Sequence, residues 1–127
     1  MAEKKRILAI DDDPLVLKVL TSVLTPMYEL HFSKSAEEAM DKLKECPPDL
    51  MLLDINMPGM SGFEFLHTIK RLPDFGSIPV IVVTGHYETE FIIYAERSGA
   101  KSVVAKPINN EDLLKKIEKA LSQGPKE

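Results

Sequence analysis

The sequence contains few of the features that mark secreted, membrane-bound or nucleic-acid-binding proteins. Cys46 is the single cysteine, so an internal disulfide is excluded and a reducing compartment is expected. No apolar run approaches the ~20 residues that a membrane-spanning helix needs, and none near the N-terminus is long enough for a signal peptide. The net charge is −4 and the longest basic stretch is Lys4-Lys5-Arg6, which argues against a nucleic-acid-binding surface. We therefore expect a cytoplasmic protein that binds neither nucleic acid nor membrane directly.

The length and composition fit one soluble globular domain. The 127 residues are 44% hydrophobic and 28% charged, and a chain of this size can bury a substantial core. We expect a single domain over residues 1–127, with a core over about 5–122 and a tail over 123–127.

Short apolar runs alternate with helical patterns along the whole chain. Strands are predicted over residues 6–10, 28–32, 49–53, 78–83 and 102–105, and helices over 14–24, 35–46, 62–72, 88–98 and from Asn109 or Asn110 to about 122. Five strand–helix units in succession indicate parallel strands joined by right-handed crossovers. The sequence therefore predicts an α/β fold built on a doubly wound parallel sheet.

Several polar residues are explained by the ends of these helices. Asp13, just before Pro14, is interpreted as a helix N-cap that needs no further role. Ser35 followed by Glu38 is a capping-box pattern, and Gly99 is expected to end a helix in the left-handed conformation.

Other polar side chains follow four of the five predicted strands at the point where each strand ends. In open α/β sheets the functional crevice lies outside the carboxyl ends of the strands, so we expect these side chains at one edge. Each alone has an ordinary explanation as a turn residue, a strand end or a solvated charge, but their joint placement is harder to explain in that way. They are Asp11 and Asp12 after the first strand, Asp54 after the third, Thr84 after the fourth and Lys106 after the fifth.

A cluster of Asp11, Asp12 and Asp54 requires a counter-charge. Two like charges ~4 Å apart repel by ~4 kcal/mol at an effective dielectric constant of ~20, so either a carboxyl group stays protonated or a cation neutralises the cluster. Oxygen ligands suit a hard ion, and a site completed by waters and phosphate oxygens suits Mg²⁺ better than Ca²⁺. The sequence thus predicts a Mg²⁺ site, and the residues at this edge exclude a histidine-rich or thiolate metal site.

The same charges indicate phosphoryl chemistry. A carboxylate that attacks a dianionic phosphoryl group needs cations and hydrogen-bond donors to offset the growing negative charge. Mg²⁺ and Lys106 would take up that charge, the Thr84 hydroxyl would bind a phosphoryl oxygen, and Gly85 would leave room for close backbone approach. The product would be an aspartyl phosphate on Asp54.

Four segments together resemble the response-regulator receiver family of two-component signalling, the CheY-like superfamily, in order, element type and spacing. They are ILAIDD at residues 7–12, LLDINMPGMSG at 52–62, VVTG at 82–85 and AKP at 105–107. The resemblance covers essentially the whole chain. It implies a flavodoxin-like fold, with five helices around a five-stranded parallel sheet of strand order 2-1-3-4-5.

The resemblance also implies a role for each residue of the site. Asp54 would be the phosphoacceptor, Asp11 and Asp12 the acidic pair for Mg²⁺, and Asn56 a metal ligand through its backbone carbonyl.

Thr84 and Lys106 would contact the phosphoryl group and couple it to the far face of the domain. The Lys106–Pro107 bond is expected to be cis.

The resemblance further implies the partners. The donor would be a phosphohistidine on a sensor histidine kinase or a histidine phosphotransfer protein in a phosphorelay. Phosphorylation would shift the surface formed by the fourth helix, the fifth strand and the fifth helix. Such a domain phosphorylates and dephosphorylates itself and is not a turnover enzyme.

On the helix predicted over 88–98, Ile93 points away from the sheet, and we interpret Tyr87, Ile93 and Tyr94 as a surface for an output domain or partner.

Two positions depart from the family pattern. The family usually has an aromatic residue three positions before the lysine, as a switch paired with the threonine, and here that position is Val103. A valine cannot swing in and out as a tyrosine does, so this route of signalling is in question although phosphorylation is not. His86 lies two residues after Thr84, where the family controls how water reaches the phosphoryl group. We interpret it as an exposed loop residue without a catalytic part.

Two other classes of function stay open on the residues alone. One is a pseudo-receiver that only binds proteins, which the retention of the full polar set disfavours and Val103 keeps open. The other is a hydrolase of the haloacid dehalogenase kind, which also uses an aspartate nucleophile and Mg²⁺. That family expects an acidic residue two positions after the nucleophile, where this chain has Asn56, and its nucleophile follows the first strand.

Overall fold

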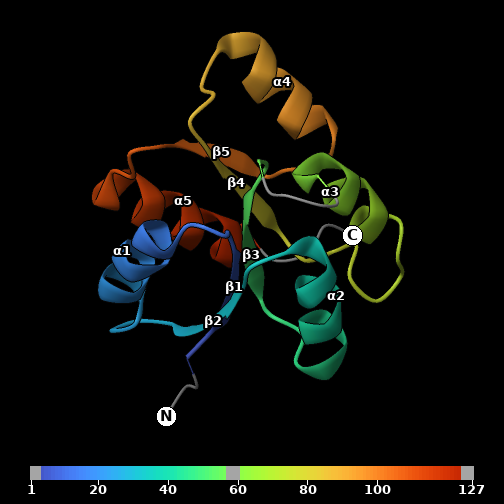
Figure 1. Ribbon diagram of the computed structural model, residues 1–127, viewed down its shortest axis with the longest axis horizontal. Helices are drawn as coiled ribbons and strands as arrows, with labels where there is room; N and C mark the ends of the chain where they lie inside the picture. Colours follow the sequence, from blue (N-terminus) through green and yellow to red (C-terminus); the bar gives the residue numbers. More distant parts are fainter. Residues whose placement is uncertain (1–3, 57–60, 124–127) are drawn as a thin grey trace.

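The computed structural model describes residues 4–56 and 61–123, which form one parallel sheet flanked by helices (Figure 1). The strand order is β2-β1-β3-β4-β5, so the predicted flavodoxin-like fold is confirmed. The strands are β1 (Arg6–Ile10), β2 (Glu29–Ser33), β3 (Leu50–Asp54), β4 (Val80–Thr84) and β5 (Ser102–Ala105). The helices are α1 (Pro14–Leu24), α2 (Ala36–Glu45), α3 (Gly62–Lys70), α4 (Thr89–Arg97) and α5 (Asn110–Gln123).

Both faces of the sheet are covered, as Figure 1 shows: α1 and α5 lie on one side, and α2 and α3 on the other. Alternate residues of β1 divide between the two cores. Ile7 and Ala9 pack into the core with α1 and α5, whereas Leu8 and Ile10 pack into the core with α2, α3 and Ala95 of α4. Every residue of β3 and of β4 is buried, which explains their almost continuous apolar sequences.

The helix starts follow the capping residues. Asp13 caps α1 by accepting a hydrogen bond from the Leu15 N–H, as predicted. Ser35 caps α2 by accepting from the Glu38 N–H, while the Glu38 carboxylate accepts from the N–H of Lys34, one residue earlier than in a standard capping box. At the other end of α4, Gly99 has φ +116°, the left-handed conformation expected of it.

Several predicted boundaries shift by one or two residues, and local turns explain three of these shifts. The Tyr28 N–H bonds to the Leu24 carbonyl and completes the turn after α1, so β2 begins one residue later than predicted. The Ile78 N–H closes a turn on Phe75, which delays the start of β4 to Val80. The Leu72 N–H reaches only the carbonyl three residues back, so α3 ends at Lys70.

Candidate functional site

The parallel register brings the carboxyl ends of four strands to one edge of the sheet. Asp54 is the last residue of β3 and lies opposite Val83 of β4, and Thr84 at the end of β4 lies opposite Ala105 of β5. Asp11 follows β1 and Lys106 follows β5 directly. The structure therefore places the polar groups singled out from the sequence at the same edge.

Three carboxylates form a compact acidic cluster at this edge. Oxygen atoms of Asp11, Asp12 and Asp54 all lie within 4.8 Å of one another. Asp11 is 3% exposed and Asp54 is 5% exposed, whereas Asp12 is open to solvent. The cluster is thus closed on the protein side and open at Asp12, which leaves an approach for an ion or a reactant.

Lys106 supplies the positive charge that faces this cluster. Its Nζ lies 3.1 Å from Asp11 Oδ2 and 3.6 Å from Asp54 Oδ1. The first contact is a hydrogen bond, and the second is an ion pair just beyond hydrogen-bonding distance. The Lys106–Pro107 peptide bond is cis, as expected.

The surroundings of Asp54 disfavour its charged form. Burial raises the pKa of Asp54 above its ordinary value, and the negative charge of Asp11 raises it further, while Lys106 acts in the opposite direction. Burial alone would lower the pKa of Lys106, but Asp11 and Asp54 outweigh it, and the pKa of Lys106 is raised. A carboxylate under this repulsion gains from any cation placed among the three oxygens.

Two backbone N–H groups orient the buried carboxylates. Asp11 Oδ1 accepts from the N–H of Asp13 at 2.9 Å, so Asp13 has a part in the site beyond capping α1. Asp54 Oδ1 accepts from the N–H of Asn56 at 3.3 Å. Of the predicted metal ligands, the Asn56 carbonyl stays a prediction, and residues 57–60 of the predicted loop lie outside the described residues.

Thr84 is buried at the end of β4, where the loop to α4 begins. Its hydroxyl oxygen accepts from the N–H of His86 at 3.1 Å, and its carbonyl accepts from the N–H of Lys106 at 2.8 Å. Thr84 therefore connects the loop after β4 with the residue that faces the acidic cluster.

Comparison with known proteins identifies the family and the fold. The family model of the response regulator receiver domain matches residues 7–118. The chain belongs to the response regulator receiver family. It is a receiver domain of the kind found in two-component response regulators.

Relatives of this receiver domain include stand-alone and longer proteins. It is 30% identical to protein PilH of Pseudomonas aeruginosa over 118 residues, which cover 92% of this chain and 98% of PilH. It is 34% identical to the nitrate/nitrite response regulator protein NarL of Escherichia coli over 121 residues, which cover 93% of this chain but only 55% of NarL. The receiver domain thus spans about half the length of several curated relatives that it matches, including 54% of the DNA-binding response regulator MtrA of Mycolicibacterium smegmatis.

A solved structure shows the same architecture. The chemotaxis protein CheY4 of Vibrio cholerae superposes on this receiver domain with a TM-score of 0.87 at 28% sequence identity, covering 94% of this chain and 100% of CheY4. The predicted membership of the CheY-like superfamily is therefore confirmed.

One residue that supports the site was not recognised from the sequence. Gly62 begins α3, and its N–H bonds to the Ile55 carbonyl. A Cβ atom at Gly62 would lie 2.5 Å from Ile55 Cα and 2.7 Å from the Asp54 carbonyl oxygen. Only glycine lets α3 approach the end of β3 so closely. The capping box of Ser61 and Glu64 that starts the helix is legible in the sequence, but the close contact is not.

The two departures from the family pattern have defined places in the receiver domain. Val103 is 3% exposed and packs in the core on the α2–α3 side. His86 is exposed, as predicted, and its ring centroid lies 5.5 Å from that of Phe91.

The predicted partner surface on α4 is exposed, but its two tyrosines contact different neighbours. Tyr94 packs edge-on against Phe63 of α3, with ring centroids 4.7 Å apart. Tyr87 contacts Lys116 of α5 instead. Ile93 is exposed on the same helix. Tyr94 thus lies beside α3, whereas Tyr87 lies beside α5.

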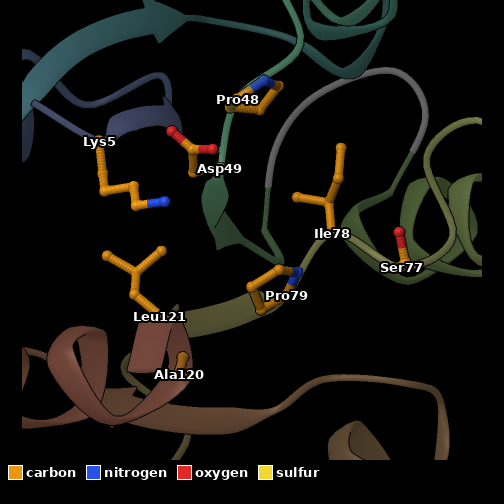
Figure 2. A pocket seen from close by; sticks show the side chains of 8 residues that line it. All are labelled: Lys5, Pro48, Asp49, Ser77, Ile78, Pro79, Ala120 and Leu121. Atoms are coloured by element: carbon orange, nitrogen blue, oxygen red, sulfur yellow. The ribbon is translucent and has the colours of Figure 1, made fainter. Parts of the chain in front are cut away.

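A hollow elsewhere in the receiver domain does not belong to this site. Figure 2 shows a cavity of about 230 Å³ where β1, β3 and β4 begin, at the opposite edge of the sheet. Lys5 and Asp49 border it, but Asp49 Oδ2 already accepts from the Arg6 N–H.

Within the described residues no helix is long and apolar enough to cross a membrane.

Proposed function

We propose that this receiver domain accepts a phosphoryl group from a phosphohistidine onto Asp54, in a site that holds Mg²⁺, and relays the change to a partner. The observation that carries this proposal is the geometry of Asp54. Its carboxylate lies among two further carboxylates and one lysine at the edge where four strands end.

The acidic cluster fits a divalent cation. Three carboxylates whose oxygens lie within 4.8 Å of one another repel strongly, and burial raises the pKa of Asp54 further. Asp11, Asp12 and Asp54 would hold Mg²⁺ together with the Asn56 carbonyl, and the exposure of Asp12 leaves room for the waters that this ion keeps. When bound, the ion would neutralise charge on the carboxylates and on phosphoryl oxygens.

The transfer itself exchanges one bond to phosphorus for another. An Asp54 Oδ atom forms a bond to phosphorus while the bond from phosphorus to the histidine nitrogen breaks. That nitrogen keeps the electron pair of the broken bond, and because the other ring nitrogen carries a proton, the ring leaves as neutral imidazole. Lys106, which already lies 3.6 Å from Asp54 Oδ1, would pair with the phosphoryl oxygens. The hydroxyl of Thr84 would donate to one of them.

The donor needs a docking surface close to Asp54. A groove of about 480 Å³ runs beside Lys106, between α1 and the segment that follows β5. Leu15, which is 72% exposed, and Val19 form its α1 side, and Pro107 and Ile108 form the other. Apolar side chains this exposed favour a protein partner, and a helix that carries the phosphohistidine would fit between them.

The output of the whole protein is also a proposal. Longer relatives carry a further segment beyond the receiver domain, so Tyr87, Ile93 and Tyr94 are proposed as a surface for an output domain or partner rather than for nucleic acid. We place the protein in the cytoplasm, and we propose that it acts as a self-phosphorylating and self-dephosphorylating switch rather than as a turnover enzyme.

Mass spectrometry after incubation with Mg²⁺ and acetyl phosphate tests the proposal. We expect the intact mass to rise by one phosphoryl group, and the gain to be absent in Asp54→Asn. The matched control is Asp41→Asn, since Asp41 is an exposed aspartate on α2, away from the site, and this variant should be phosphorylated like the wild type. If the mass of the wild type does not rise, the alternative of a pseudo-receiver that only binds proteins is favoured. Steady hydrolysis of phosphate esters would favour a hydrolase instead.

A further inference from the structure

A tyrosine of the loop between β4 and α4 is fastened to α5. The Tyr87 hydroxyl lies 3.3 Å from Lys116 Nζ, and the same Nζ lies 5.7 Å from the centroid of the Tyr87 ring. Lys116 is itself held in place, since its Nζ donates to the Val103 carbonyl at 2.7 Å and pairs with Asp112 at 3.2 Å. The loop therefore has an anchor on a rigid part of the fold.

The other end of this short loop is anchored at the site. The His86 N–H donates to the Thr84 hydroxyl at 3.1 Å. Between them, a Cβ atom at Gly85 would meet no atom of the described residues within 4 Å, so the chain at Gly85 has space in which to move. Tyr87 is thus separated from the hydroxyl of Thr84 by one hydrogen bond and one peptide unit.

We propose that Tyr87 and Lys116 form a clasp that loosens when Asp54 is phosphorylated, so that the clasp reports the state of the site to the α4–β5–α5 surface. This inference rests on the proposed function of Asp54. It names a coupling element specific to this chain, in which the residue of β5 three positions before Lys106 is the buried Val103.

The direction follows from the two anchors. In the conformation described, Lys106 pairs directly with the Asp54 carboxylate and the clasp is closed. A phosphoryl group on Asp54 would draw the Thr84 hydroxyl toward the site, and the His86 N–H bonded to that hydroxyl would follow it. A pull at one end of so short a loop lengthens the contact at the other end, which is the Tyr87–Lys116 contact. Breaking the clasp should raise the population of the loosened loop, and phosphorylation that proceeds through this state becomes faster in proportion to that population.

The chain offers a direct reporter for this clasp. It contains no tryptophan and three tyrosines, Tyr28, Tyr87 and Tyr94. Incorporation of 3-fluorotyrosine gives three fluorine resonances, each assigned by a Tyr→Phe substitution. On phosphorylation with acetyl phosphate and Mg²⁺, we expect the Tyr87 resonance to shift most. A resonance of Tyr87 that stays unchanged while the intact mass shows one added phosphoryl group would overturn the clasp and leave the proposed function standing. If the wild type gains no phosphoryl group, both fail.

Rates of phosphorylation test this shift in the population of the loosened loop. Tyr87→Phe removes only the hydroxyl, and we expect phosphorylation by acetyl phosphate to become about two- to fivefold faster, which is the range of one exposed hydrogen bond. Lys116→Gln should have a similar effect, and the double variant should be no faster than either single one. Tyr28→Phe and Lys115→Gln are the matched controls, since neither residue belongs to the clasp or to the proposed partner surface. Equal rates in Tyr87→Phe and Tyr28→Phe would overturn the inference.

Discussion

Replacing Asp54 with asparagine should stabilise the fold in the absence of divalent cations. The substitution keeps the shape of the side chain, and the amide oxygen can still accept from the Asn56 N–H. It removes one of three clustered negative charges. Asp54, the proposed centre of the site, is thus expected to lower the free energy of unfolding when no cation is bound, because its negative charge is then uncompensated.

The size of the effect can be worked from the distances. Carboxylate oxygens within 4.8 Å of one another repel by at least about 3 kcal/mol per pair at an effective dielectric constant of ~20. Lys106, at 3.6 Å from Asp54 Oδ1, returns about 4 to 5 kcal/mol on the same scale. Solvent screens the contribution of the exposed Asp12, so the two carboxylates and Lys106 nearly cancel, and the burial of the charged Asp54 carboxylate decides the sign. We expect a net gain of about 1 to 2 kcal/mol for Asp54→Asn. For a chain of this length that corresponds to a rise in Tm of roughly 4 to 8 °C.

Thermal unfolding in EDTA at several pH values measures this gain and its sign. Because the pKa of Asp54 is raised in the folded state, the native protein binds more protons than the unfolded chain at pH values between the ordinary pKa of Asp54 and its raised pKa. The wild type should therefore recover stability relative to Asp54→Asn as the pH falls through the raised pKa. The difference in Tm should be largest near pH 7 and should shrink toward pH 4. An Asp54→Asn variant that melts at or below the wild-type temperature at pH 7, with no dependence on pH, would refute the electrostatic account.

Three further predictions follow from the same site. Mg²⁺ at about ten times its dissociation constant should stabilise the wild type by about 1.4 kcal/mol in thermal unfolding, and Asp12→Asn should lose most of this response while folding normally, because Asp12 is exposed. Lys106→Met should destabilise the protein by about 1 to 3 kcal/mol in urea titrations, and by clearly less in an Asp54→Asn background, where fewer buried charges are left unpaired. Gly62→Ala should cost about 2 kcal/mol or more and slow phosphorylation, since its Cβ would lie 2.5 Å from Ile55 Cα, whereas Gly85→Ala, whose Cβ would meet no described atom within 4 Å, should leave the stability unchanged.

The fold could be predicted from the sequence because several local signals agree. The apolar runs of β3 and β4 have the length and continuity of strands buried on both faces, and the alternation with helices leaves a parallel sheet as the simplest arrangement. The strand order came from the family resemblance rather than from these patterns. The boundaries were less accurate, since turns at Tyr28 and Ile78 depend on hydrogen bonds that residue types do not specify.

The candidate site was predictable in its members but not in its contacts. Strand ends meet at one edge in any parallel sheet, which was enough to bring Asp54 and Lys106 together. The close approach at Gly62 was missed because it depends on the angle at which α3 leaves the end of β3. Tyr87 was grouped with Ile93 and Tyr94 in one partner surface, but it lies in the loop before α4 and contacts Lys116, which helical spacing cannot predict for a residue outside the helix.

Chemical identification of the phosphorylated residue tests the central claim most directly. The protein would be treated with acetyl phosphate and Mg²⁺, reduced with borohydride, which converts an aspartyl phosphate into homoserine, and then digested and sequenced by mass spectrometry. We predict homoserine at position 54 and an unchanged aspartate at positions 11 and 12. Homoserine at either of those positions, or a stable phosphate on a serine, threonine or histidine with Asp54 intact, would contradict the account.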